Sequence, residues 1–61
     1  MNYKFAMKMD MYDKLKFGKY KDNTLNFLHY NDKPYFRWLL DEGRIILTES
    51  GCKQLMEAGG L

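Results

Sequence analysis

The sequence predicts a small α+β domain. An N-terminal β-hairpin, with or without a third short strand, packs against two or three short helices. Three observations predict this class. Apolar and polar residues alternate through the first 21 positions, apolar residues take helical spacing after Thr24, and a length of 61 residues allows one domain spanning 1–61. The 46% hydrophobic and 16% aromatic content is typical of an ordered chain, although a domain this short buries only about 60% of its unfolded surface.

The predicted hairpin occupies the first third of the chain. Tyr3–Met9 carries apolar side chains at odd positions, which predicts a strand, and Asp10–Asp13 predicts a turn. Alternation resumes at Lys14–Phe17 and shifts by one residue at Gly18, as at a β-bulge, before the turn pair Asp22-Asn23. In such a hairpin the lysines share one solvent face: Lys4, Lys8, Lys14, Lys16, Lys19 and Lys21.

Two helices are predicted next from their capping residues. Thr24 caps a short helix that ends around Asn31-Asp32, and Asp32 caps a second helix over Lys33–Glu42. Pro34 fits the first turn of the second helix, where no N–H is needed, and Gly43 is the expected stop residue. The second helix is expected to supply much of the core through Tyr35, Phe36, Trp38, Leu39 and Leu40, with Tyr35 half exposed.

The rest of the chain predicts an extended segment and a last helix. Arg44–Leu47 is short and β-branched, so we expect a strand or an extended link. Thr48 caps a helix from Glu49 to about Ala58, with Leu55 and Met56 facing inward. The final residues, 59–61, are expected to form a frayed end.

Composition excludes several classes of protein. Ten Lys/Arg against eight Asp/Glu give a net charge of +2, which fits neither an acidic nucleic-acid mimic nor a heavily basic condensing protein. One cysteine excludes a disulfide framework and a zinc site of several thiolates. No apolar run approaches the roughly 18 residues of a membrane span, and Met1–Met9 lacks a signal-peptide core. We therefore expect a cytoplasmic protein without membrane contact.

The basic charge is concentrated near the N-terminus, which points to a phosphate-rich partner. Residues 1–22 hold six lysines against three aspartates, a net charge of +3, and the remainder has a net charge of −1. We expect the lysines to neutralise backbone phosphates weakly, with a dissociation constant of roughly 10⁻⁴–10⁻⁶ M, and Tyr12, Tyr20 or Tyr30 to stack on unpaired bases. The predicted nucleic-acid-binding residues are Lys14, Lys16, Lys19 and Lys21, supported by Lys4, Lys8, Tyr20 and Arg37, with Arg44 as an extension. The alternative is that the lysines only keep an exposed strand edge soluble.

Catalysis, cofactors and metals are not expected. His29 and Cys52 each occur once, and no third group that would complete a nucleophilic site is evident. We expect His29 to be a surface or capping residue and Cys52 to be a small buried hydrophobe. No metal-ligand spacing is recognisable, and no glycine-rich phosphate loop precedes a helix.

Two short motifs resemble a known module. Phe17-Gly18-Lys19-Tyr20-Lys21, followed by Asp32, Tyr35 and Trp38, resembles the exonuclease X-like C-terminal domain, which carries an F-G-K-Y-K strand and a D-P-x-Y-L-x-W helix start. The resemblance covers about 26 residues, Phe17–Glu42. It departs at Asp22-Asn23, where the family has Gly-Lys, at the Asp-Pro pair, which Lys33-Pro34 replaces, and at Phe36, which replaces leucine. The resemblance implies an accessory DNA-engaging module, fused or docked to a nuclease, without catalytic residues of its own.

The competing prediction is a protein-interaction module. Five methionines and ten aromatic residues in so short a chain favour an exposed adaptable apolar patch. Such a module would dock on a nuclease, a polymerase or another nucleic-acid enzyme, for example as a phage-type modulator or inhibitor of a host enzyme. The chain could act as a monomer or as a homodimer that relieves a marginal core.

Overall fold

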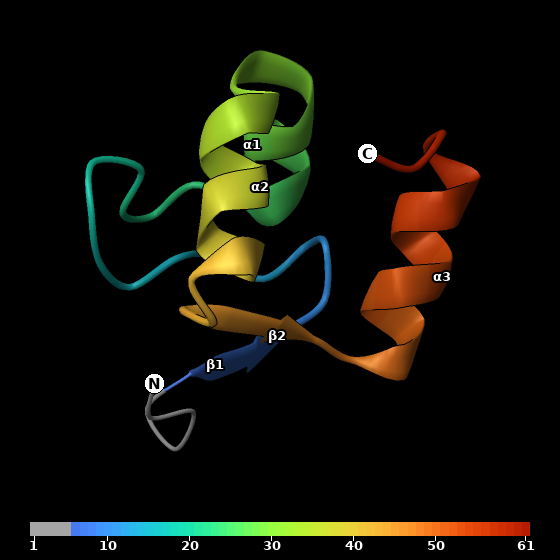
Figure 1. Cartoon of the computed structure of the whole chain (residues 1–61), viewed down its shortest axis with the longest axis horizontal. Coiled ribbons are helices and arrows are strands. Elements are labelled where there is room, and N and C mark those ends of the chain that lie inside the picture. Colours follow the sequence, from blue (N-terminus) through green and yellow to red (C-terminus); the bar gives the residue numbers. More distant parts are fainter. Residues whose placement is uncertain (1–5) are drawn as a thin grey trace.

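The computed structural model describes residues 6–61 and has a mixed α+β architecture, as the sequence predicts. The elements in chain order are β1 (Met7–Met9), α1 (Leu25–Asn31), α2 (Lys33–Asp41), β2 (Ile45–Leu47) and α3 (Glu49–Glu57). The helices α1 and α2 pack together on one side of the two-stranded sheet, and α3 follows β2 (Figure 1). β1 lies within the predicted first strand, of which Tyr3, Lys4 and Phe5 lie outside the described residues.

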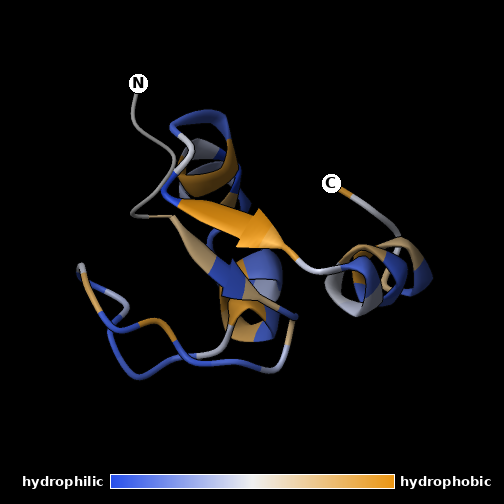
Figure 2. Cartoon of the chain, turned by 90° about the horizontal axis from the view of Figure 1, so that it is seen from below, coloured by the Kyte–Doolittle hydropathy of each residue, from blue (hydrophilic) through white to orange (hydrophobic). Residues whose placement is uncertain are grey.

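The sheet is parallel, so the predicted N-terminal hairpin is wrong. β1 pairs with β2 in the register Met7↔Ile45, Lys8↔Ile46 and Met9↔Leu47. A parallel pair cannot be joined by a tight turn and needs a long crossover connection, which here consists of the loop after β1 and both helices α1 and α2. The β-branched run predicted as a strand or link is therefore the true partner of β1, and it is hydrophobic along its length (Figure 2).

The lysine-rich segment after β1 is an irregular loop and not a second hairpin strand. Its only bridge within the described residues is the antiparallel pair Lys14↔Thr24. Leu15 is fully buried, its N–H donates to Asn23 O at 2.9 Å, and its carbonyl accepts from Asp22 N–H at 2.8 Å. The period-two pattern thus arises because Leu15 and Phe17 pack toward the core between exposed lysines. Gly18 has φ +79° and opens a tight turn instead of a bulge.

The predicted helix limits are confirmed. They could be predicted because each depends on a capping residue close in sequence. The Thr24 hydroxyl accepts from Phe27 N–H at 3.1 Å, and Asp32 Oδ1 accepts from Tyr35 N–H at 3.2 Å. The Thr48 hydroxyl caps α3 by accepting from Gly51 N–H at 3.0 Å. Gly43 ends α2 with φ +68°, the left-handed conformation that a helix stop requires.

The core lies between the helices and the sheet. It consists of Met9, Met11, Leu15, Leu25, Leu28, Phe36, Leu39, Ile45 and Leu55. α3 approaches β1 closely at Gly51, where an added Cβ would lie 2.9 Å from Met9 O and 3.0 Å from the Cα of Asp10. Only glycine permits this distance between the helix and the strand end.

Two apolar residues predicted to face inward are exposed. Trp38 is 42% exposed, since the buried face of α2 is set by Phe36 and Leu39, and a residue two positions after Phe36 turns about 200° away from it. Met56 is 76% exposed because it follows Leu55, which marks the buried face of α3.

The predicted environments of the unique histidine and cysteine are both wrong, since His29 is buried and Cys52 is exposed. His29 is buried, with 1% exposed surface, because its ring packs edge-on against Phe36 and its Nε2 lies 2.8 Å from Gly60 O. Cys52 lies on the exposed face of α3 as a free thiol. The end of the chain is not frayed as predicted, since Gly60 N–H also donates to Leu55 O at 2.8 Å.

Across residues 6–61, no helix is both long enough and apolar enough to cross a membrane.

Candidate nucleic-acid interface

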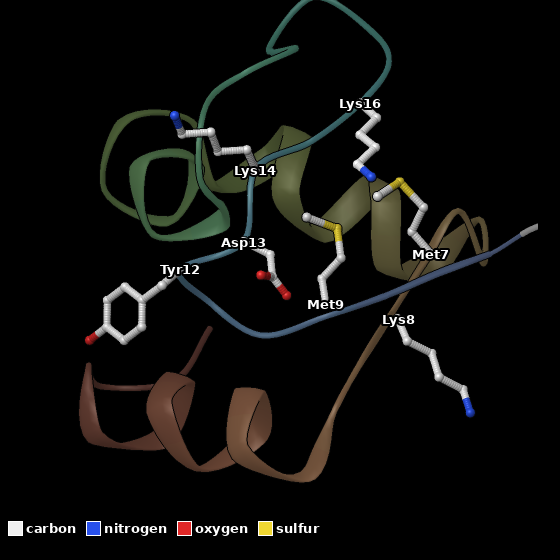
Figure 3. Close-up of a pocket in the computed structure, with 7 residues that line it drawn as sticks. All are labelled: Met7, Lys8, Met9, Tyr12, Asp13, Lys14 and Lys16. Carbon is white, nitrogen blue, oxygen red and sulfur yellow. The ribbon is translucent and has the colours of Figure 1, made fainter.

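Three of the predicted lysines line one open hollow beside β1. Lys8, Lys14 and Lys16 surround a space of about 510 Å³ whose remaining walls are Met7, Met9, Tyr12 and Asp13. Figure 3 shows the Lys16 side chain extending toward Met7, whereas Lys8 points away on the opposite side of the strand. Lys14 and Lys16 against Asp13 leave the rim of this hollow with a net positive charge, although the Lys8 ammonium group extends away from it.

The turn between β1 and the loop fixes one wall of the hollow. Asp10 Oδ1 accepts from the N–H groups of Tyr12 and Asp13 at 2.8 and 3.1 Å, and Asp13 Oδ2 accepts from Asp10 N–H at 3.0 Å. Met11 is buried within this turn, and its N–H donates to Gln54 Oε1 on α3 at 2.8 Å. The one carboxylate of the hollow, that of Asp13, is therefore held in place by a backbone N–H group.

Further along the loop, Tyr20 holds the chain against the start of α2. Its hydroxyl donates to Asp32 Oδ2 at 2.7 Å, and Lys19 Nζ lies 3.8 Å from the same oxygen. The hydrogen bond from Tyr20, together with the Tyr35 N–H and the Lys19 charge, lowers the pKa of Asp32 against the opposing effect of desolvation. The same hydrogen bond, with desolvation, raises the pKa of Tyr20. Around neutral pH, Tyr20 is therefore a neutral donor and Asp32 a charged acceptor.

Four rings form a continuous surface next to this hydrogen bond, which we call the aromatic row. The ring centroids are 6.1 Å apart for Phe27 and Tyr20, 5.1 Å for Tyr20 and Tyr35, and 5.6 Å for Tyr35 and Trp38. Phe27 and Trp38 at the two ends are 41% and 42% exposed, and the two tyrosines between them are half-buried. Tyr35 and Trp38 adjoin because they are three residues apart on α2.

Two cations lie over the aromatic row. Lys19 Nζ is 5.2 Å from the Tyr20 ring centroid and 5.5 Å from that of Tyr35. The Arg44 guanidinium carbon is 5.3 Å from the Trp38 centroid. These distances fall within the range of a cation–π interaction, so the surface combines flat apolar rings with positive charge.

Gly18 allows the loop to pass over Tyr35. A Cβ at Gly18 would lie 2.6 Å from the Tyr35 hydroxyl oxygen, and its φ of +79° disfavours other residues. The two motifs that are separate in sequence thus meet in space: Gly18, Lys19 and Tyr20 from the loop contact Asp32 and Tyr35 from the helix start. Their spacing has a structural reason, the attachment of the loop to α2.

The remaining predicted site residues do not join this surface. Arg37 Nε lies 4.0 Å from Asp41 Oδ2, and Arg37 lines a separate hollow of about 350 Å³ with Lys33, Pro34 and Leu61. Lys21 is exposed near the end of the loop, and Lys4 lies outside the described residues.

Sequence reasoning missed Trp38 and Phe27 as exposed rings and treated Arg44 only as an extension of the basic patch. The exposure of Trp38 could have been found from its spacing in the helix. It lies three residues after Tyr35, which places the two rings side by side, and two residues after the buried Phe36, which turns it away from the core.

Among residues 6–61, no group of three or more His, Cys, Asp or Glu side chains is arranged to hold a metal ion. His29 presents only its Nε2 to a partner, a backbone carbonyl.

Comparisons with protein-family models, with curated proteins and with solved structures gave no match for this chain.

Proposed function

We propose that this chain is a small accessory module that contacts nucleic acid through its exposed lysines. The observation that carries the proposal is the position of Lys14 and Lys16 at one open hollow of net positive charge, to which Lys8 contributes the base of its side chain. The same loop continues to Lys19 and Lys21, so a phosphate backbone laid along it would meet successive ammonium groups.

The chemistry of the hollow favours phosphate over a small organic ligand. Lysine binds phosphate as a mobile point charge and needs no enclosed geometry, and the hollow is open to solvent. A few such contacts supply weak, sequence-independent affinity, with a dissociation constant of roughly 10⁻⁴–10⁻⁶ M at physiological salt. Weak affinity suits a module that assists another nucleic-acid enzyme.

The resemblance to the exonuclease X-like C-terminal domain supports the same role. The residues that carry it meet at the junction of the loop and α2, beside the lysines. On this proposal the chain engages DNA beside a nuclease or a related enzyme and performs no catalysis itself. Its single free thiol suits a reducing compartment, so we place it in the cytoplasm.

Fluorescence anisotropy with labelled oligonucleotides at about 50 and 200 mM salt tests the proposal. The informative variant is Lys14→Gln with Lys16→Gln, because neither side chain takes part in a salt bridge with another described residue. The matched control is Lys33→Gln with Lys53→Gln, which also removes two charges, at hollows other than the one that Lys14 and Lys16 line. Lys19 is unsuitable because it contacts Asp32 and two rings.

We expect weaker binding by the double variant, and a log–log salt slope that is shallower by about one for each lysine–phosphate interaction removed. The control should bind like the parent protein. Absence of binding at low salt, or equal weakening in the double variant and the control, would contradict the proposal.

Exposed apolar side chains favour a second candidate, a protein-interaction module. Tyr12, Tyr30 and Met56 are exposed and lie on the turn, α1 and α3 respectively. This function would give a complex, with a partner or with a second copy, that survives high salt and is unchanged by the lysine variants. Size-exclusion chromatography at two salt concentrations separates the two candidates.

A further inference from the structure

The aromatic row exposes rings that a small domain would ordinarily bury. Large aromatic side chains dominate core energetics, and this chain has few apolar residues to spare. The only tryptophan nevertheless keeps 42% of its surface exposed, and Phe27 at the other end keeps 41%. Both ends of the row therefore present apolar ring surface to a ligand.

The row is held in place before any ligand arrives. Tyr35 and Trp38 are fixed on α2, and Tyr20 is tied to that helix by its 2.7 Å hydrogen bond to Asp32. Asp32 in turn caps α2 through Tyr35 N–H. Because these rings are already ordered, a ligand that stacks on them causes little further loss of side-chain conformational entropy. A small contact area can then give useful affinity.

Arg44 adds a second kind of contact at the exposed end of the row. Its guanidinium lies over Trp38, and among residues 6–61 no carboxylate oxygen lies within 4.0 Å of it. A guanidinium that lies over a ring and has no carboxylate partner retains N–H groups that match phosphate oxygens in a bidentate manner. The Trp38 ring and a phosphate donor are thus in contact at this end of the row, so a base that stacks on Trp38 would also meet the guanidinium.

Rings that stack beside cations that bind phosphate are the combination used to bind single-stranded nucleic acid. A duplex covers the faces of its bases by internal stacking, so it could use only the cations. We infer that the aromatic row is a stacking surface for unpaired nucleobases, and that the module binds single strands in preference to duplexes. This inference rests on the proposed function and specifies its ligand.

The fluorescence of Trp38, the only tryptophan, reports directly on stacking. The protein is titrated with a single-stranded oligonucleotide, a duplex of the same length, and an abasic strand that keeps the phosphates but lacks the bases. We expect strong quenching by the single strand, little by the duplex or the abasic strand, and tighter binding of the single strand than of either.

Two variants separate stacking from charge. Trp38→Leu keeps apolar bulk but removes the ring, and should weaken single-strand binding by about 5- to 150-fold while leaving duplex binding nearly unchanged. Tyr30→Leu is the control, because Tyr30 is also exposed but its ring contacts His29 and not the row. Circular dichroism confirms that both variants are folded.

The possible failures are distinct. If no oligonucleotide binds at low salt, the proposed function fails and this inference fails with it. If single strand and duplex bind equally, with unchanged Trp38 fluorescence and no weakening in Trp38→Leu, the lysine contacts stand and the stacking surface is refuted.

Discussion

The two flanks of α2 carry the same kinds of charge in different settings. On one flank, Tyr35 and Trp38 lie beneath the cations of Lys19 and Arg44. On the adjoining solvent-facing side, Arg37 Nε lies 4.0 Å from Asp41 Oδ2, four residues along the helix. Arg37 is exposed and its charge faces a carboxylate, whereas Arg44 lies over the Trp38 ring with no carboxylate oxygen within 4.0 Å among residues 6–61.

This difference explains why a count of basic residues is a poor guide to a binding surface. Arg37 and Arg44 look equivalent in the sequence, but only Arg44 is placed beside rings and lacks a carboxylate partner among the described residues. What a cation contacts decides whether it remains available to a ligand. Substitutions on the two flanks should therefore have unequal effects, and three of them test the contrast.

The largest expected effect is that of Trp38→Ala on stability. A fully buried tryptophan would cost about 3–5 kcal/mol, as the sequence prediction of a core Trp38 implied, but a side chain 42% exposed should cost about 2 kcal/mol. Urea denaturation followed by circular dichroism measures it. Trp38→Phe should recover most of the stability, and complete unfolding of Trp38→Ala would show that the residue is buried in solution.

An intermediate effect is expected from Asp32→Ala, which releases the loop from the aromatic flank. The variant loses the cap of α2 and the acceptor for the Tyr20 hydroxyl. Removal of a cap alone lowers the melting temperature of a domain this size by about 4–8 °C. Asp41→Ala, on the other flank, should leave the melting temperature nearly unchanged. Equal melting temperatures for the two variants would contradict the assigned role of Asp32.

The same carboxylate gives a pH signature for this variant. The pKa of Asp32 is lower in the folded protein than in the unfolded chain, so its contribution is complete above the unfolded value near 3.8 and is lost as pH falls through the folded value. The pKa of Tyr20 is raised, so its contribution is complete below the unfolded value near 10.0 and is lost as pH rises through the folded value. Asp32→Ala should flatten both dependences.

The smallest effect is expected from Arg37→Ala. An exposed i,i+4 pair contributes about 0.3–0.5 kcal/mol, so the melting temperature should change little. Because Arg37 lies away from the aromatic row, the quenching of Trp38 by single strands should also persist. A large decrease in binding by this variant would instead restore Arg37 to the predicted site and remove the distinction between the flanks.

The helices could be predicted because their ends are determined locally. Each helix cap or stop contacts backbone only a few residues away, so it can be recognised from the sequence alone. These residues are Thr24, Asp32, Thr48 and Gly43. Burial within a helix was harder to predict. An apolar residue such as Trp38 faces inward only if its angular position around the helix axis matches that of the buried residues Phe36 and Leu39.

The sheet and the site could not be predicted in the same way. The alternation of Lys14–Lys21 is genuine, but a loop anchored by Leu15 and Phe17 produces it as readily as a strand does. The choice of β2 as partner of β1 depends on tertiary packing that no local pattern encodes. Lys8, Lys14 and Lys16 line one hollow without forming the single face of a hairpin, whereas the aromatic row depends on the folded arrangement of two distant motifs.

The parallel pairing of β1 with β2 has a consequence for the order of folding. The pairing of Met7 with Ile45 closes a long loop, which is entropically costly, so we expect the sheet to form late in folding. α3 docks on the end of this sheet, where Thr48 N–H donates to Met9 O at 2.9 Å and Gly51 rests on the same carbonyl. The first strand and the last helix are therefore in direct contact, and a change at Gly51 should disturb both ends of the chain.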